Sequence, residues 1–217
     1  MSQSSPKKPL LLVTDGLSAT SEKTTISFMA SHSSTAPTAH RFTRDEYYRM
    51  AQAGLFREER VELLDGEIIT MSPKLTPHAY AVNQLMYTLM AGFGASAIVR
   101  VQDPIVLNNW SEPEPDIAVC SPVPDRYKHA HPRADQVLLV VEVAESSLTY
   151  DRIRKTRAYA ASGIVEYWIV NLIDQRIEVF TDPDPRSHNY RQRRDVGAGE
   201  SLPLPNGNTI AVADILP

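Results

Sequence analysis

Two acidic residues stand within segments that are otherwise apolar. Glu142 follows the apolar run 137–141 and precedes Val143 and Ala144, and Asp116 opens an earlier apolar segment. Runs that are apolar at both odd and even positions predict central strands covered on both faces. A buried, ionised carboxylate costs several kcal/mol unless it is compensated, and two neighbouring carboxylates also repel each other. Because a divalent cation would compensate both, we expect a hard-metal site with Asp116 and Glu142 as ligands.

The composition limits the class of protein. A chain of 217 residues with 42% hydrophobic content suits one globular domain with a sizeable core. No segment approaches the roughly 20 apolar residues that cross a membrane, so we expect no membrane partner. The single cysteine, Cys120, excludes an internal disulfide, predicts a reducing, cytoplasmic setting, and is interpreted as a small buried hydrophobe. The net charge of −4 gives no general nucleic-acid signature, so DNA contact would need a local basic patch or a bound metal.

The first 40 residues differ in composition from the rest. They are rich in Ser and Thr, and Lys7-Lys8 precede only four apolar residues, which does not fit a signal peptide. We expect residues 1–40 to be a flexible N-terminal extension and residues 41–217 to be the folded domain. Met29 lies shortly before the folded-looking sequence, and we hypothesise that the native chain starts there. N-terminal peptide mapping of the natural protein would test this.

The N-terminal half of the domain shows clear local signals. Thr43 and Glu46 form a capping box that starts a helix running to Gly54. Asp65-Gly66 lies between two apolar segments and predicts a β-hairpin. A second helix is expected from Thr76-Pro77, with the apolar stripe Val82, Leu85 and Leu89 widened by Met86 and Met90.

The remaining elements alternate between strands and one helix. We expect strands over 98–107, from residue 116, and over 137–144, followed by a helix over 149–162 that Gly163 ends. Two further strands are predicted over 166–170 and 176–180, with short strands and loops in the tail. This order is typical of a mixed α/β domain with one main sheet.

The helix after Glu142 carries a possible partner for the acids. A catalytic lysine two residues after the metal carboxylate would fall at Ala144, where it is absent. However, Asp151, Lys155 and Tyr159 are spaced i, i+4 and i+8 and share one helix face. If this helix packs beside the strand end, the Lys155 ammonium can reach the position that Ala144 leaves open. The alternative is a solvated Asp151–Lys155 pair worth a few tenths of a kcal/mol.

Other polar residues have both a structural and a functional interpretation. Glu62 shares a strand face with Leu64, and taken alone it suits a half-exposed strand position. His78 lies in the first turn of its helix, where a histidine is more often a packing or capping residue than a ligand. A dense basic cluster comprises Arg152, Arg154, Lys155 and Arg157. Such a cluster is usually a solvated helix face, although beside a metal site it would suit phosphate.

Ordered motifs over residues 41 to about 215 resemble the Uma-two family of predicted endonucleases, within the PD-(D/E)XK nuclease superfamily. The matching segments are Arg41-Phe42-Thr43 with Glu46-Tyr47, Glu62 to Ile68, Met71-Ser72-Pro73 with His78, Pro115-Asp116-Ile117, Val140 to Val143, Asp151 with Lys155 and Tyr159-Ala160, and Gly163 to Val170. The chain departs from the family pattern at Glu145-Ser146-Ser147, where a Ser-Pro pair is usual. This departure affects the turn that positions Lys155.

The resemblance implies a restriction-endonuclease-like fold, in which helices flank a mixed β-sheet and a β-hairpin precedes it. It also implies an acidic site that binds Mg²⁺, with Mn²⁺ as a substitute, and a motif lysine moved from the strand to the next helix, at Lys155. By the same carry-over, Glu62, Asp116 and Glu142 are the acidic set. The accessory neighbours are His78, Asp151 and Tyr159.

These inferences predict a metal-dependent endonuclease that hydrolyses phosphodiester bonds in DNA. Asp116 and Glu142, helped by the Val143 carbonyl, would hold the metal, and Glu62 would complete its shell directly or through water. Lys155 would orient the attacking water or offset phosphoryl charge. A homodimer is expected if two strands are cut as a pair. The alternative is a non-catalytic nuclease-fold module that binds nucleic acid or protein; a Cys120 or serine hydrolase lacks a supporting motif.

Overall fold

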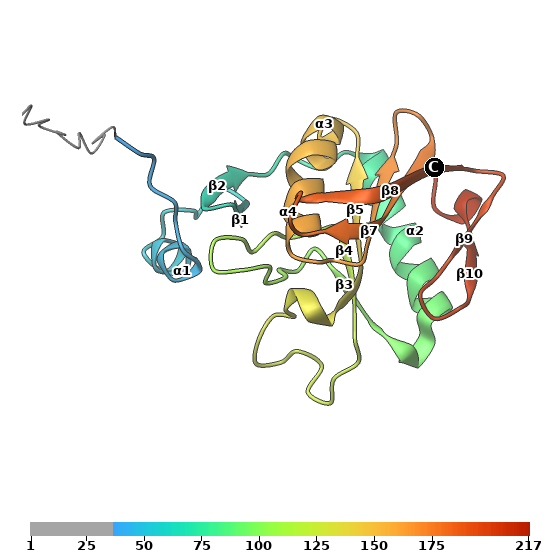
Figure 1. Cartoon of the computed structure of the whole chain (residues 1–217), viewed down its shortest axis with the longest axis horizontal. Coiled ribbons are helices and arrows are strands. Elements are labelled where there is room, and N and C mark those ends of the chain that lie inside the picture. The colour runs from blue at the N-terminus through green and yellow to red at the C-terminus, as the bar shows by residue number, and fades with distance from the viewer. Residues whose placement is uncertain (1–36) are drawn as a thin grey trace, which may run out of the picture. The chain divides into compact units, whose positions relative to one another are not determined.

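A six-stranded mixed sheet forms the centre of the domain in this computed structural model, which describes residues 37–217 (Figure 1). Only β5 and β6 run parallel to each other, and the other neighbouring pairs are antiparallel. The predicted mixed α/β class is therefore confirmed. In spatial order the strands are β3 (Ile98–Val101), β4 (Ile117–Cys120), β5 (Val137–Ala144), β6 (Glu166–Asn171), β7 (Arg176–Asp184) and β8 (Asn189–Gly197).

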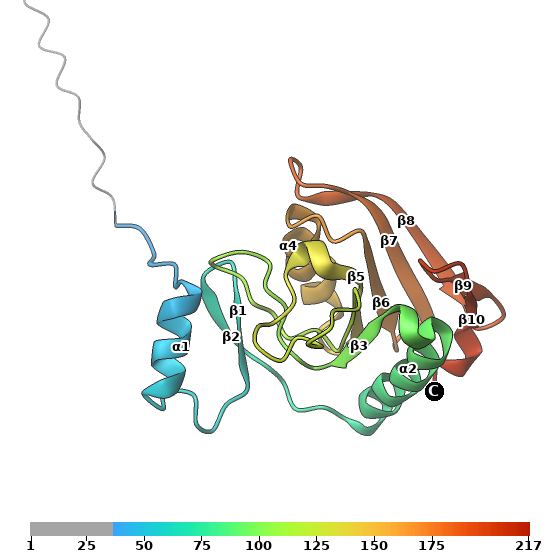
Figure 2. The ribbon, with the colours of Figure 1, turned by 90° about the horizontal axis from the view of Figure 1, so that it is seen from below.

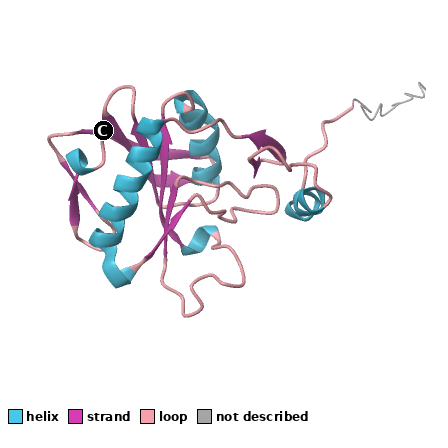
Figure 3. Cartoon of the chain, turned by 180° about the vertical axis from the view of Figure 1, so that it is seen from behind, coloured by secondary structure: helices cyan, strands magenta, loops and turns pink. Residues whose placement is uncertain are grey.

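Helices cover both faces of the sheet, as Figure 2 shows. The longest helix, α2 (Thr76–Phe93), packs on one face and lies in front of the sheet in Figure 3. On the other face lies a helical segment that contains α3 (Leu148–Tyr150) and α4 (Thr156–Ala161). β5 is accordingly apolar on both sides. Its residues Leu139 and Val141 enter the first core cluster, whereas Val140 and Ala144 enter the second. Because side chains alternate along a strand, Glu142 faces the side of α4.

The predicted capping box and hairpin are confirmed. Helix α1 (Arg44–Gln52) starts where the Thr43 hydroxyl accepts the Glu46 N–H and the Glu46 carboxylate accepts the Thr43 N–H at 2.8 Å. β1 (Val61–Leu64) and β2 (Glu67–Thr70) form an antiparallel pair. Asp65 and Gly66 between them have φ values of 52° and 76°, which the hairpin turn requires of both residues.

Some predicted boundaries are wrong. The strand expected over 98–107 ends at Val101, because Gln102 takes a left-handed φ of 56° and Pro104 has no N–H to donate. Met90 does not widen the buried stripe of α2, since it is 54% exposed. The tail holds the long strand β8 as well as the short pair β9 (Ser201–Pro203) and β10 (Thr209–Ala211).

The helix predicted over 149–162 contains a π-helical turn over Asp151–Lys155, between α3 and α4. The Thr156 N–H donates to the Asp151 carbonyl, five residues back, and the Thr156 hydroxyl donates to the same oxygen at 2.9 Å. Such turns are rare and occur mainly within α-helices at functional sites. Gly163 follows with a φ of 75°, as expected for the helix end.

Two expectations concern the N-terminus. The hypothesised start at Met29, and all but the last four residues of the expected extension, lie outside the described residues.

Three short 3₁₀ turns complete the described elements, at Gly94–Ser96, Ala134–Gln136 and Val212–Asp214. No helix within residues 37–217 is long and apolar enough to cross a membrane.

Candidate active site

Asp116 and Glu142 are neighbours in the sheet. Ile117 of β4 pairs with Val141 of β5, and this register places Asp116 opposite Glu142. The Asp116 N–H donates to Glu142 Oε2 at 3.3 Å, and the Val143 N–H donates to Asp116 Oδ2 at 2.9 Å. Both carboxylates are buried, with exposed fractions of 7% and 6%. The structure therefore brings the predicted pair together at one strand end.

Lys155 enters this acidic group from the π-helical turn. Its Nζ lies 3.1 Å from Glu142 Oε1 and 2.7 Å from Glu62 Oε2, so one ammonium joins two carboxylates. The Tyr159 hydroxyl donates to the same Glu142 Oε1 at 2.7 Å. Because both Lys155 and Asp151 are buried, the alternative of a solvated pair between them is wrong. The half-exposed interpretation of Glu62 is also wrong, since that side chain is 2% exposed.

The remaining predicted neighbours hold the acids in place. His78 Nε2 lies 3.0 Å from Asp116 Oδ2. Asp151 lies at the start of the π-helical turn, four residues before Lys155, and accepts the Ser147 hydroxyl at 2.6 Å. Sequence reasoning missed Gln102, whose side-chain amide donates to Asp116 Oδ1 at 3.1 Å. Gln102 lies within the segment expected to be a strand, and its left-handed backbone gave no recognisable signal.

The electrostatics of the group reflect a surplus of acids. Burial raises the pKa of Glu142 to about 8. The Lys155 ammonium lowers this pKa, whereas the negative charges of Asp151, Asp116 and Glu62 raise it. Burial likewise raises the pKa of Asp151 to about 6. For Asp116, burial acts upward, but the contacts with His78, Val143 and Gln102 together hold its pKa below the usual value. Burial alone would lower the pKa of Lys155, but Glu142 and Glu62 outweigh it and raise that pKa.

The basic cluster of this helix is not a free phosphate-binding face. Arg152 forms an ion pair with Glu178, and Arg154 Nη2 lies 3.1 Å from Glu67 Oε2. Lys155 is buried among the acids, and among the four basic residues Arg157 alone is exposed. Cys120 is fully buried, and burial raises the pKa of its thiol to about 12, which suits the predicted hydrophobe and not a nucleophile.

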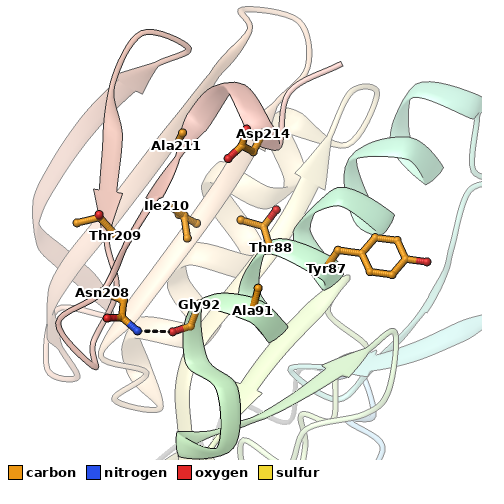
Figure 4. Close-up of a pocket in the computed structure, with 9 residues that line it drawn as sticks. All are labelled: Tyr87, Thr88, Ala91, Gly92, Asn208, Thr209, Ile210, Ala211 and Asp214. Atoms are coloured by element: carbon orange, nitrogen blue, oxygen red, sulfur yellow. Dashed lines mark hydrogen bonds between the residues drawn. The ribbon is translucent and has the colours of Figure 1, made fainter.

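The acidic group opens into a cleft of about 890 Å³. Its walls include six of the predicted residues, namely Glu62, His78, Asp116, Glu142, Asp151 and Lys155. A second pocket of about 650 Å³ lies between α2 and β10 (Figure 4). That pocket contains one acid, Asp214, and its Asn208 amide is already bonded to the Gly92 carbonyl at 2.6 Å. The chemistry-bearing residues therefore converge on the first cleft.

Two acids of the cleft have the donor atoms that Mg²⁺ prefers. Asp116 and Glu142 supply hard carboxylate oxygens from adjacent strands, which fit that ion, and Val143 also lines the cleft. Within residues 37–217, no three His, Cys, Asp or Glu side chains are grouped so that they could hold a metal. Glu62 is turned to Lys155 and to the Glu114 N–H, which donates to its Oε2 at 3.1 Å. Direct ligation by Glu62 thus stays a prediction.

The fold of this chain is similar to that of a known crystal structure. A crystal structure described as "a putative nuclease belonging to DUF820 from Anabaena variabilis ATCC 29413" matches with a TM-score of 0.61 and 14% identity. The match covers 80% of this chain and 97% of that one, which shows that the two share a fold.

The sequence matches the model of a known protein family over most of its length. The family model described as "Uma2: Putative restriction endonuclease" matches residues 44–213, and the chain belongs to this family. The resemblance to the Uma-two family is thus confirmed. A search of curated proteins found no match.

Proposed function

We propose that the protein is a metal-dependent endonuclease that hydrolyses phosphodiester bonds in DNA. The observation that carries the proposal is a buried acidic cluster, in which Glu62 and Glu142 share the ammonium of Lys155 and Asp116 lies opposite Glu142. Buried charges are normally paired or coordinate a metal, and this cluster holds more acids than its lysine can pair. The family assignment supports nuclease chemistry at such a site.

Asp116 and Glu142 would hold the metal, Mg²⁺ or Mn²⁺ in its place. A bound divalent ion lowers the pKa of a water ligand and neutralises charge on phosphate oxygens. The contact of His78 with Asp116 fixes the orientation of that carboxylate. The Tyr159 hydroxyl does the same for Glu142, and both contacts reduce the rearrangement needed when a ligand enters.

Lys155 has two tasks in this proposal. Its ammonium holds Glu142 and Glu62 in fixed positions, and it adds a positive charge next to the place where phosphoryl charge develops. The products expected from the superfamily resemblance are a 5′-phosphate and a 3′-hydroxyl. A homodimer and a cytoplasmic location stay predictions.

Cleavage assays with matched variants test the proposal. Plasmid and single-stranded DNA are incubated with Mg²⁺ or Mn²⁺ and the wild type, Asp116→Asn, Glu142→Gln or Lys155→Ala. Glu58→Gln, which alters an exposed acid, is the control for handling and contamination. The proposal predicts cleavage by the wild type and the control only. Equal cleavage by all variants would locate the activity elsewhere.

A non-catalytic nuclease-fold module is the second candidate. Glu142 Oε1 already accepts both Lys155 Nζ and the Tyr159 hydroxyl, which is a self-sufficient arrangement that a binding scaffold could retain. Calorimetric titration with Mn²⁺ separates the two candidates. A catalytic site binds Mn²⁺ in the wild type and loses that binding in Glu142→Gln, whereas a scaffold shows no difference between them.

A further inference from the structure

A second lysine of the cleft has no partner. Lys74 lies in the loop between β2 and α2 and lines the cleft that holds the acidic cluster. Its Nζ is shielded from solvent, yet it makes no hydrogen bond within the described part of the chain. A buried ammonium that has lost its water and gained no acceptor is unfavourable. Such a group is expected to find its partner in a ligand.

Other atoms of the same cleft share this condition. Five buried side-chain nitrogen or oxygen atoms in residues 37–217 lack a partner, and three of them line this cleft: Lys74 Nζ, the Tyr150 hydroxyl and His78 Nδ1. The other two belong to Arg100 and Arg176, whose guanidinium groups are held by Asp103 at 3.2 Å and Asp174 at 2.7 Å. Unsatisfied polar atoms are thus concentrated where the proposed chemistry takes place.

The start of α2 adds to the positive character of this wall. Lys74 immediately precedes the N-cap residue Leu75, whose side chain provides no cap for the first-turn N–H groups. The N-terminus of an 18-residue helix carries a partial positive charge and attracts anions. Both Leu75 and His78 of this first turn line the cleft.

The acids of the cluster do not satisfy Lys74. Asp116, which is close enough to favour the charged form of Lys74, already accepts from the Val143 N–H, His78 and Gln102. Burial is the larger influence and lowers the pKa of Lys74. The group that would complete this environment is an anion with several acceptor oxygens, and phosphate has that chemistry.

We propose that Lys74 binds a phosphate group of the nucleic-acid backbone, with the Tyr150 hydroxyl as a second donor to the bound strand. The nature of the ligand rests on the proposed function, because a nuclease must hold its strand by the backbone. Lys74 and Lys155 then divide the work. Lys155 stays with the carboxylates, and Lys74 holds substrate.

Binding of a fluorescein-labelled DNA duplex, followed by anisotropy over a range of salt concentrations, tests the assignment. Ca²⁺ replaces Mg²⁺, and a parallel series contains EDTA, so that binding is measured apart from cleavage. Lys74→Met should raise Kd on the order of tenfold and reduce the salt slope by about 0.9, the value for one phosphate contact. Lys74→Arg, which keeps the charge, should recover most of the affinity. The exposed Lys128 provides the control Lys128→Met, which should bind like the wild type.

Thermal unfolding separates a binding role from a structural one. Lys74→Met removes an unpaired buried ammonium, so its Tm should equal or exceed that of the wild type while its affinity falls. Tyr150→Phe should show a smaller loss of affinity, about threefold. Wild-type affinity and salt slope in Lys74→Met would overturn the assignment, as would a wild type that binds no nucleic acid.

The two proposals fail in different ways. A wild type that binds DNA through Lys74 but does not cut it with Mg²⁺ would refute the nuclease proposal alone. A wild type that cuts DNA, together with a Lys74→Met variant of unchanged KM and Kd, would refute the role of Lys74 alone.

Discussion

Glu142 and Glu178 are buried acids of the same sheet, and their surroundings are opposite. Glu178 in β7 is fully buried and accepts from Arg152 Nε at 3.0 Å and from Asn171 Nδ2 at 2.9 Å, while Arg193 Nη2 lies 3.1 Å away. Burial would raise the pKa of Glu178, but the bonds from Arg152 and Asn171 and the charge of Arg193 together lower it. Two arginines thus neutralise one acid.

At Glu142 the ratio is reversed. Glu62, Asp116 and Asp151 are buried near it, and Lys155 is the lysine that pairs with it, at 3.1 Å. Burial raises the pKa of Glu142, and the neighbouring acids raise it further. This fold can thus neutralise a buried acid fully, and it does so at Glu178. The surplus at the cleft fits the proposed binding of a cation and a substrate there.

The largest effect is expected from Glu142→Gln. This change removes a proposed metal ligand, so DNA cleavage should fall at least about 100-fold in a plasmid nicking assay. Stability should not fall, because the change also removes one acid from a crowded group. The matched variant Glu178→Gln should still cleave DNA. If both variants lost cleavage equally, the contrast between the two sites would have no functional meaning.

Lys155→Met should produce the largest loss of stability. It leaves Glu62 and Glu142 without their ammonium, and an unpaired buried charge typically costs about 3–5 kcal/mol. Urea unfolding followed by circular dichroism measures this. Lys128→Met, at an exposed loop lysine, should change the free energy of unfolding by less than about 0.5 kcal/mol. A small cost for Lys155→Met would show that the acids do not depend on it.

Glu178→Gln should destabilise the protein by a smaller amount, about 1–3 kcal/mol. Its arginine partners are 32% and 43% exposed at their side chains, so they can regain water when the carboxylate is lost. Glu62 and Glu142, the partners of Lys155, are buried and cannot regain water in this way when the ammonium is lost. The same urea titration measures the loss of unfolding free energy in Lys155→Met and in Glu178→Gln. A larger loss in Glu178→Gln would contradict the expected order of the two sites.

The smallest effect concerns pH. The pKa of Glu178 is lower in the folded protein than its ordinary value of 4.5, so the folded state favours the ionised form. This contribution is fully present above about pH 4.5 and is lost as the pH falls through the folded pKa. The difference in unfolding free energy between wild type and Glu178→Gln should therefore shrink on acidification. A constant difference between about pH 7 and pH 3 would contradict the assigned pairing.

Local rules account for the parts of the fold that were predicted. The capping box at Thr43 and the turn at Asp65-Gly66 depend on residues that are adjacent in sequence. β5 was found because a strand covered on both faces needs apolar side chains at every position except its functional one. The end of β3 was missed, since apolar residues continue past Val101 although the backbone turns at Gln102.

From the residue pattern alone, the candidate site was predicted where its residues interrupt such patterns, whereas Glu62 and His78 were assigned to it through the family resemblance. Glu142 and Asp116 stand out in apolar strands, and the helical spacing of Lys155 pointed toward them. Lys74 could not be found in this way, because its environment arises when the loop before α2 meets β4 and β5 in three dimensions. The burial of Glu62 likewise depends on a lysine 93 positions later in the chain.

The π-helical turn has a consequence for how this site tolerates change. Its extra residue sets the rotation of the helix between Asp151 and Tyr159, and the Asp151 carbonyl accepts from both groups of Thr156. Deleting one residue there would close the wide turn to an ordinary one and change the rotation and rise between Asp151 and Tyr159. Tyr159 would then leave Glu142, even with every side chain of the candidate site intact. Backbone length in this turn is thus as strict a requirement as residue identity, and gene-level insertions or deletions there should be as damaging as replacement of Lys155 itself.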